Sequence, residues 1–162
     1  MDNNAFTAER VSKSATITLE GPIERVFPLF GAIEEKQWAD GWNPTVLYPL
    51  SEQIEEGMVF TTPGHGHGET TVAWIMSKYQ TDNRLIEYIV STANRYWMIT
   101  IQCFALSATQ TKSTIRYTYT GLTLLGNEIN KHAIEKMYER NLKDWEEAIN
   151  HYLKTGKVLK HQ

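Results

Sequence analysis

The stretch that decides the fold runs from residue 123 to residue 155 and reads TLLGNEINKHAIEKMYERNLKDWEEAINHYLKT. It predicts one long amphipathic helix, because its apolar side chains recur at steps of three and four and therefore share one face. That apolar stripe comprises Ile134, Met137, Tyr138, Trp145, Ile149 and Tyr152. Thr123 can cap the start of the helix and Gly156 can end it. A helix with one apolar face must pack against another element, and only a sheet formed by the preceding residues is long enough.

The residues before this helix predict antiparallel strands joined by short turns. The clearest alternation covers residues 113–121, where Ile115, Tyr117 and Tyr119 share one face. Further strands are expected over residues 14–19, 45–48, 57–62, 69–79, 85–92 and 96–106. Two short helices are expected after the first strand, one beginning at Pro22 and one over residues 33–38. The predicted fold class is therefore α+β, with a curved antiparallel sheet wrapped around the long C-terminal helix.

Length and composition indicate one globular domain covering residues 1–162, with residues 1–10 expected to be flexible. The net charge is -3 and Lys and Arg are scattered among Asp and Glu, so nucleic acid is not an expected partner. Cys103 is the one cysteine and the polar N-terminus has no signal-peptide pattern, so a cytoplasmic location is expected. The most apolar strand, residues 96–106, is too short and too polar for stable membrane insertion. The sequence does not indicate an oligomeric state.

Four short segments carry a resemblance to known proteins. They are VFPLF at residues 26–30, EKQWADGWNP at residues 35–44, the pair Gly126 and Asn127, and YLKTGK at residues 152–157. With the order of the predicted elements, they resemble the helix-grip fold of the START-like superfamily, also called SRPBCC, and in particular its uncharacterised bacterial members. That superfamily includes pollen allergens, plant hormone receptors, lipid-transfer domains, polyketide aromatase/cyclases and activators of the heat-shock chaperone ATPase. The resemblance implies a hydrophobic cavity between sheet and helix, a small hydrophobic molecule as partner, and no shared catalytic residues.

The candidate ligand-binding residues come from the inward strand positions, the helix stripe and the link after the short helices. They are Trp42, Tyr88, Trp97, Tyr117, Tyr119, Met137, Tyr138, Asn141 and Trp145. The tyrosine hydroxyls can orient a ligand, or they can simply reach the rim of a packed core. Asn141 is flanked by the apolar stripe, so it can recognise a ligand, bond to a sheet tyrosine or lie at the boundary with solvent.

The segment HGHGE, residues 65–69, is the one arrangement that could be a metal site, with His65, His67 and Glu69 on the same side of an extended chain. Residues four apart in a strand are separated by roughly 13 Å, so these three side chains cannot converge without a sharp bend. No metal or other cofactor is therefore predicted. The alternatives are a mobile hairpin corner with exposed histidines and a lid over the cavity mouth. Cys103 has no adjacent base and is expected to fill the core.

These features predict binding or transport of a small, lipid-like or aromatic molecule in an internal cavity. One alternative is a cyclase or dehydratase in which a Tyr, His or Glu inside the cavity moves protons, with no catalytic residue assigned. The other is a protein-interaction module. A carrier should have a closed, mostly dry pocket, and an enzyme should have a titratable residue inside its pocket. An interaction module should have a filled core and an exposed apolar patch. Whether the protein is an enzyme stays open at this point.

Overall fold

The computed structural model describes residues 5–160, with the side chain of His65 excepted. The described chain begins with strand β1 (Arg10–Leu19), the short helix α1 (Ile23–Val26) and two 3-10 helices, η1 (Phe27–Phe30) and η2 (Glu34–Gln37). The strands that follow are β2 (Thr45–Tyr48), β3 (Val59–Gly66), β4 (Glu69–Gln80), β5 (Leu85–Ser91), β6 (Arg95–Ala105) and β7 (Thr111–Gly121). Helices α2 (Leu124–Met137) and α3 (Lys143–Thr155) come last.

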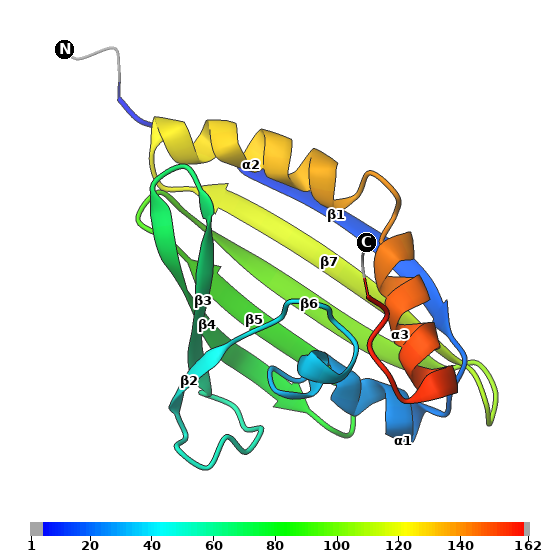
Figure 1. The fold of residues 1–162 in the computed structure, drawn as a ribbon. Helices are drawn as coiled ribbons and strands as arrows, with labels where there is room; N and C mark the ends of the chain where they lie inside the picture. The colour runs from blue at the N-terminus through cyan, green and yellow to red at the C-terminus, as the bar shows by residue number, and fades with distance from the viewer. Residues whose placement is uncertain (1–4, 161–162) are drawn as a thin grey trace.

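The strands within the described residues form one seven-stranded sheet in the order β1-β7-β6-β5-β4-β3-β2. All pairings are antiparallel, which confirms the expected meander and the α+β class. The sheet is curved, and α2 and α3 lie along its β1 and β7 strands, with α1 beside the end of α3 (Figure 1). Residues 1–4 of the segment expected to be flexible lie outside the described residues, while Asn127 forms hydrogen bonds with Thr7 and Glu9.

The inward faces predicted for the strands are buried, because alternate side chains of each strand point to the concave side of the sheet. In β5 to β7 these buried side chains are Ile86, Tyr88, Val90, Trp97, Ile99, Ile101, Cys103, Ile115, Tyr117 and Tyr119. Ala105 continues the alternation of β6 at the end of that strand, where it is exposed. The two short helices after β1 are present, and the indole of Trp38 donates to the carbonyl of Leu29.

The expectation of one continuous C-terminal helix over residues 123–155 is wrong. The chain leaves the helix after Met137, and α3 begins only at Lys143. At this break Asn141 and Leu142 have left-handed backbone conformations, with φ of 51° and 60°. Leu142 is fully buried at the turn. A straight helix of that length would extend roughly 50 Å, beyond the roughly 40 Å of the longest strand, so the break lets both helical segments bury their apolar faces.

The start of α2 is held tightly against the sheet. The hydroxyl of Thr123 accepts a hydrogen bond from the amide of Gly126 at 3.0 Å, which confirms the expected cap. A Cβ atom on Gly126 would lie only 1.8 Å from the carbonyl oxygen of Asn94, in the turn between β5 and β6. Only glycine allows this close approach of helix and turn. The expected end of α3 is also confirmed, since Gly156 has a φ of 73°.

Candidate ligand-binding pocket

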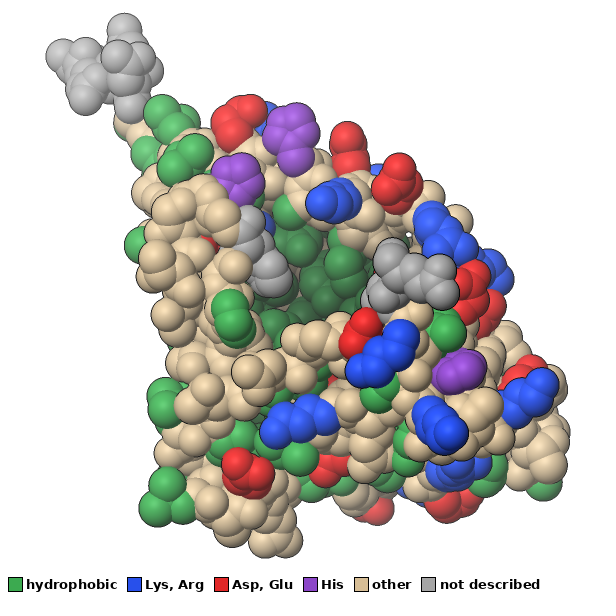
Figure 2. Space-filling model, viewed as in Figure 1, with side chains coloured by type: hydrophobic (Ala, Val, Ile, Leu, Met, Phe, Trp, Pro, Cys, Tyr) green, Lys and Arg blue, Asp and Glu red, His purple; other side chains and the backbone are tan. Residues whose placement is uncertain are grey.

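A pocket of about 890 Å³ lies between the sheet and α2. Its walls come from β3, β4, β6 and β7, from α2, from the link before β2 and from the turn between α2 and α3. In Figure 2 the pocket is a hollow with a hydrophobic floor, and histidine, lysine and arginine side chains stand along its mouth. The pocket is open to solvent at one side and has charged side chains in its lining, so it is not the closed, mostly dry cavity expected of a carrier.

Five of the nine candidate residues line this pocket. They are Trp42, Trp97, Tyr117, Tyr119 and Met137. Trp42 is fixed by a hydrogen bond of 2.6 Å from its indole nitrogen to the carbonyl of Ala32, and it packs edge-on against Trp74 at 5.4 Å between ring centres. The structure therefore brings together side chains from the link, from β6 and β7, and from α2. That they bind a ligand remains a prediction.

The other four candidate residues lie outside the pocket lining. The Tyr88 hydroxyl donates to the carbonyl of Phe30 at 2.6 Å, and its ring is buried in the core. Tyr138 turns its hydroxyl into the backbone of β7. Trp145 packs between Trp38 and Tyr117, with ring centres 5.7 and 6.4 Å away. Asn141 was placed on the apolar stripe on the assumption of a continuous helix, and it is instead exposed in the break.

Two tyrosine hydroxyls and one indole nitrogen on the pocket wall have no hydrogen-bond partner among the described residues. They belong to Tyr117, Tyr119 and Trp97, and all three side chains are largely buried. Burial raises the pKa of Tyr117 well above its ordinary value and that of Tyr119 to about 12. Both phenols therefore stay protonated at neutral pH, and each offers a donor to whatever occupies the pocket.

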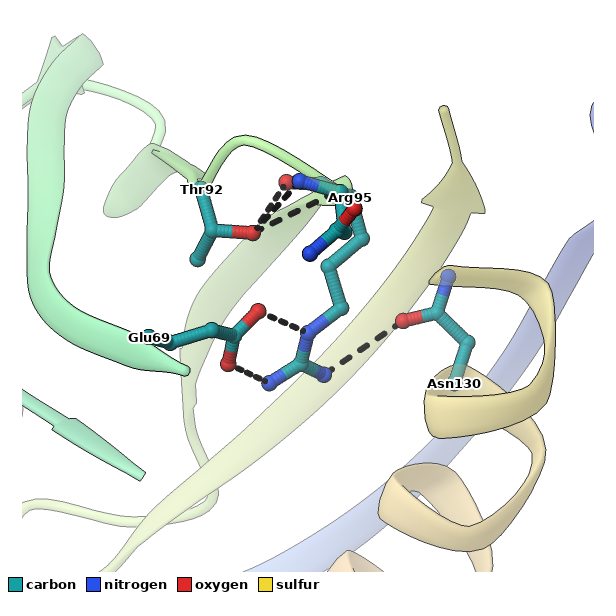
Figure 3. A network of polar contacts seen from close by, with 5 residues as sticks. Glu69, Thr92, Arg95 and Asn130 are labelled. Carbon is teal, nitrogen blue, oxygen red and sulfur yellow. Dashed lines mark hydrogen bonds and ion pairs between the residues drawn. The ribbon is translucent and has the colours of Figure 1, made fainter. Parts of the chain in front are cut away.

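An ion pair that the sequence did not reveal lies on the same wall. Arg95, the first residue of β6, donates from Nε and Nη2 to the two carboxylate oxygens of Glu69, at 2.9 and 2.8 Å (Figure 3). Its Nη1 donates to the side-chain oxygen of Asn130 on α2 at 3.4 Å. The guanidinium carbon lies 4.5 Å from the ring centre of Trp97 and 5.8 Å from that of Tyr119. A charged residue in a predicted turn gives no pattern from which such burial can be inferred.

Other lining residues lie on α2, where the inward stripe begins earlier than Ile134. Ile129 and Ala133 line the pocket together with Met137, and their spacing of four was visible in the sequence. His132 and Lys136 flank them at the mouth. Beyond the helix, the lining is completed by the charged residues Glu139, Arg140 and Asp144.

The glycine-rich segment forms the tip of the hairpin between β3 and β4. Pro63, Gly64 and His67 of this tip line the pocket, and His67 occupies the turn with a φ of 57°. The carboxylate of Glu69 is paired with the guanidinium of Arg95. Within residues 5–160 no group of three or more His, Cys, Asp or Glu side chains is placed to hold a metal ion. The side chain of His65 lies outside this description, and the absence of a metal stays a prediction.

Cys103 lies in the core, as its position in mid-strand indicated. Its sulfur is 3.1 Å from the hydroxyl oxygen of Ser113, and burial raises the pKa of the thiol to about 11. A thiol with this pKa is a poor nucleophile at neutral pH.

Within residues 5–160, none of the helices combines the length and the apolar character that crossing a membrane requires.

Comparison with solved structures identifies the fold. Norcoclaurine synthase from Thalictrum flavum superposes with a TM-score of 0.68 at 11% identity, over 98% of this chain and 99% of that one. An aromatase/cyclase, Zhui, from a Streptomyces species has a TM-score of 0.68 at 14% identity, over 90% and 94% of the two chains. A protein of unknown function from Staphylococcus aureus has a TM-score of 0.65 at 13% identity, over 91% and 96%. No protein-family model and no curated protein matches the sequence.

The chain therefore has a helix-grip fold, as the order of its predicted elements indicated, and it shares this fold with the three solved structures. Its C-terminal helix is divided into α2 and α3, and both segments remain packed against the sheet. Proteins that share this architecture include ligand-binding and cyclase proteins. Sequence identities of 11–14% to these solved structures define the fold and do not define the function.

Proposed function

We propose that the protein binds a small, largely apolar, planar molecule in the pocket between the sheet and α2. The observation that carries the proposal is the wall formed by Trp97, Tyr117 and Tyr119. There, aromatic faces border about 890 Å³ of open space while two hydroxyls and one N–H group have no partner among the described residues. These three groups belong to residues that line the pocket, so a ligand or water there can supply their hydrogen bonds.

The size and chemistry of the pocket fit this class of ligand. Ligand pockets are commonly about 300–1,000 Å³, apolar in the main, with a few polar groups that orient the bound molecule. In one solved structure norcoclaurine synthase holds dopamine and hydroxybenzaldehyde, which are small aromatic molecules. That observation belongs to a protein of the same fold and supports the present proposal by analogy.

The test is titration with N-phenyl-1-naphthylamine, an uncharged fluorescent probe. Wild-type protein should bind it at one saturable site. Ala133→Trp places a large ring in the pocket from α2 and should abolish binding, because Ala133 lines the pocket and is only half-buried. Ala105→Trp is the matched control, since Ala105 is exposed at the far end of β6 and should not affect binding. Failure of the wild-type protein to bind, or equal binding by the Ala133→Trp variant, contradicts the proposal.

A second candidate function is an enzyme of the cyclase or dehydratase type. It is favoured by the titratable side chains on the pocket wall, which include His67, His132 and Asp144. These groups can give or accept a proton close to a bound molecule. Incubation of the identified ligand with the protein, followed by mass spectrometry, distinguishes the two functions. A carrier returns the ligand unchanged, and a dehydratase returns a product lighter by one water. A cyclase returns an isomer of the same mass, which liquid chromatography before the mass spectrometer separates from the ligand.

A further inference from the structure

The end of the pocket beside the β3–β4 hairpin contains charges where the rest of the wall is aromatic and aliphatic. The side chains of Arg95 and Glu69 there are only 4% and 2% exposed. Replacing a buried ion pair by apolar residues of similar volume is often neutral or stabilising, so folding alone does not account for a pair in this position. Arg95 also lines the pocket, which places its guanidinium within reach of a ligand.

Part of the hydrogen-bonding capacity of Arg95 is unused. A guanidinium has five N–H donors, and Glu69 and Asn130 take three of them, from Nε, Nη2 and Nη1. One N–H on each Nη therefore has no partner among the described residues. Figure 3 shows Glu69 along one side of the guanidinium and Asn130 at Nη1. Two N–H groups on neighbouring nitrogens form a planar fork, and such a fork matches the two oxygens of a carboxylate.

The charges near this end favour an anion. Arg95 and Glu69 together are neutral, and Lys136, on the same pocket wall, forms no ion pair within residues 5–160. The acidic lining residues, Glu139 and Asp144, come after the end of α2 at Met137, whereas Asn130, which contacts Arg95, lies in the first half of α2. A ligand anion beside Arg95 would thus meet an unpaired cation while its own repulsion by those carboxylates is weak.

We propose that this end of the pocket is a carboxylate subsite and that the ligand is an aromatic carboxylic acid. The proposal rests on the function proposed above. The free fork of Arg95 binds the carboxylate, Lys136 compensates its charge, and the ligand ring extends along the pocket wall toward Tyr117. Glu69 and Asn130 hold the guanidinium in place, and the indole face 4.5 Å away keeps it flat against the wall.

The alternative is that the ion pair has only a structural role. Arg95 on β6 bonds to Glu69 on β4 and to Asn130 on α2, and these bonds stabilise the packing of the β3–β4 hairpin. A structural role of that kind would not distinguish a charged ligand from an uncharged one of the same shape. A carboxylate subsite therefore predicts a higher affinity for a charged ligand than for an uncharged one of the same shape, whereas a purely structural ion pair predicts equal affinities. 2-Naphthoate and 2-naphthamide are suitable probes, since they have nearly the same size and differ in charge.

We expect wild-type protein to bind 2-naphthoate at least about tenfold more tightly than 2-naphthamide at pH 7, because charge-assisted bidentate hydrogen bonds are lost with the amide. The double variant Arg95→Met/Glu69→Leu removes both charges at once and avoids leaving one unpaired, so it should fold and lose this preference. Lys136→Met, at an exposed position, should reduce the preference several-fold. Lys131→Met is its control, as Lys131 is exposed on α2, pairs with Glu9 and Glu128 and lies outside this pocket.

Each outcome of the titrations is decisive. Equal binding of the two probes by wild-type protein overturns the carboxylate subsite and leaves the pocket as a binding site. A preference for 2-naphthoate that survives in the double variant overturns the role of Arg95. If 2-naphthoate, 2-naphthamide and N-phenyl-1-naphthylamine all fail to bind, the proposed function itself fails.

Discussion

The hydroxyl of Tyr138 is inserted into the backbone of Tyr117's strand. It accepts a hydrogen bond from the amide of Tyr117 at 3.0 Å and donates one to the carbonyl of Ile115 at 2.9 Å. A side chain at the end of α2 thereby fixes the strand that carries two of the pocket phenols, Tyr117 and Tyr119. The break in the helix begins at the same residue.

Replacing Tyr138 by Phe removes this hydroxyl and keeps the ring. The amide of Tyr117 and the carbonyl of Ile115 each lose a buried partner, so we expect the free energy of unfolding to fall by about 1–3 kcal/mol. Urea denaturation measures the change. Tyr48→Phe is the control, because Tyr48 is 57% exposed, and it should change stability by no more than about 0.5 kcal/mol. Equal effects of the two substitutions would show that the Tyr138 hydroxyl does not support β7.

The close contact of Gly126 with the β5–β6 turn predicts a second effect on stability. An alanine Cβ would lie 1.8 Å from the oxygen of Asn94, so Gly126→Ala must displace the start of α2 despite the better helix propensity of alanine. We expect a loss of about 1–3 kcal/mol in unfolding free energy, measured by thermal or urea denaturation. Glu135→Ala, at an exposed position of α2, should have an effect close to zero. An increase in stability for Gly126→Ala would contradict the packing described here.

The ion pair between Arg95 and Glu69 predicts strongly non-additive energetics. Glu69→Leu leaves the guanidinium buried without its carboxylate and should cost about 3–5 kcal/mol of stability. Adding Arg95→Met should recover a large part of that loss, because no unpaired charge then remains. A double-mutant cycle measured by urea denaturation gives the coupling energy. If the double variant were as unstable as the sum of the single variants, the two side chains would not act as a pair.

Glu35, in η2, predicts a pH dependence of stability. Burial, and then the neighbouring charge of Glu34, raise the pKa of its carboxyl well above the ordinary 4.5. The folded state therefore binds this proton more tightly than the unfolded state, and the resulting stabilisation is lost as pH rises from the ordinary pKa through the raised one. Glu35→Gln should become progressively more stable than wild type over that interval.

Urea denaturation of wild type and Glu35→Gln at a series of pH values between about 4 and 8 tests this expectation. Glu55→Gln, at an exposed position, is the matched control and should follow the wild-type profile. A constant difference between Glu35→Gln and wild type at every pH would mean that the Glu35 carboxyl does not titrate differently in the folded state.

The architecture was accessible from the sequence because it depends on periodic patterns. Alternation in residues 113–121 and the stripe of the last helical region define the sheet and what covers it. The helix break was not predicted, since Tyr138 and Leu142 continue an apolar pattern and only the length of the sheet forces the chain to turn. Arg95 was missed for a different reason. Its burial depends on Glu69 and Asn130, which lie 26 and 35 residues away in the chain, and no local pattern reports such a contact.

The binding of a ligand in this pocket can be observed directly through the indole N–H signals of the five tryptophans in a 1H–15N NMR spectrum. Trp42, Trp74 and Trp97 line the pocket, whereas Trp38 and Trp145 lie outside its lining. Addition of N-phenyl-1-naphthylamine should shift the Trp97 signal most, because its N–H has no partner among the described residues, and should leave the signal of Trp38 nearly unchanged. No saturable shift at Trp97, or shifts of equal size at Trp38 and Trp97, would contradict binding at this site.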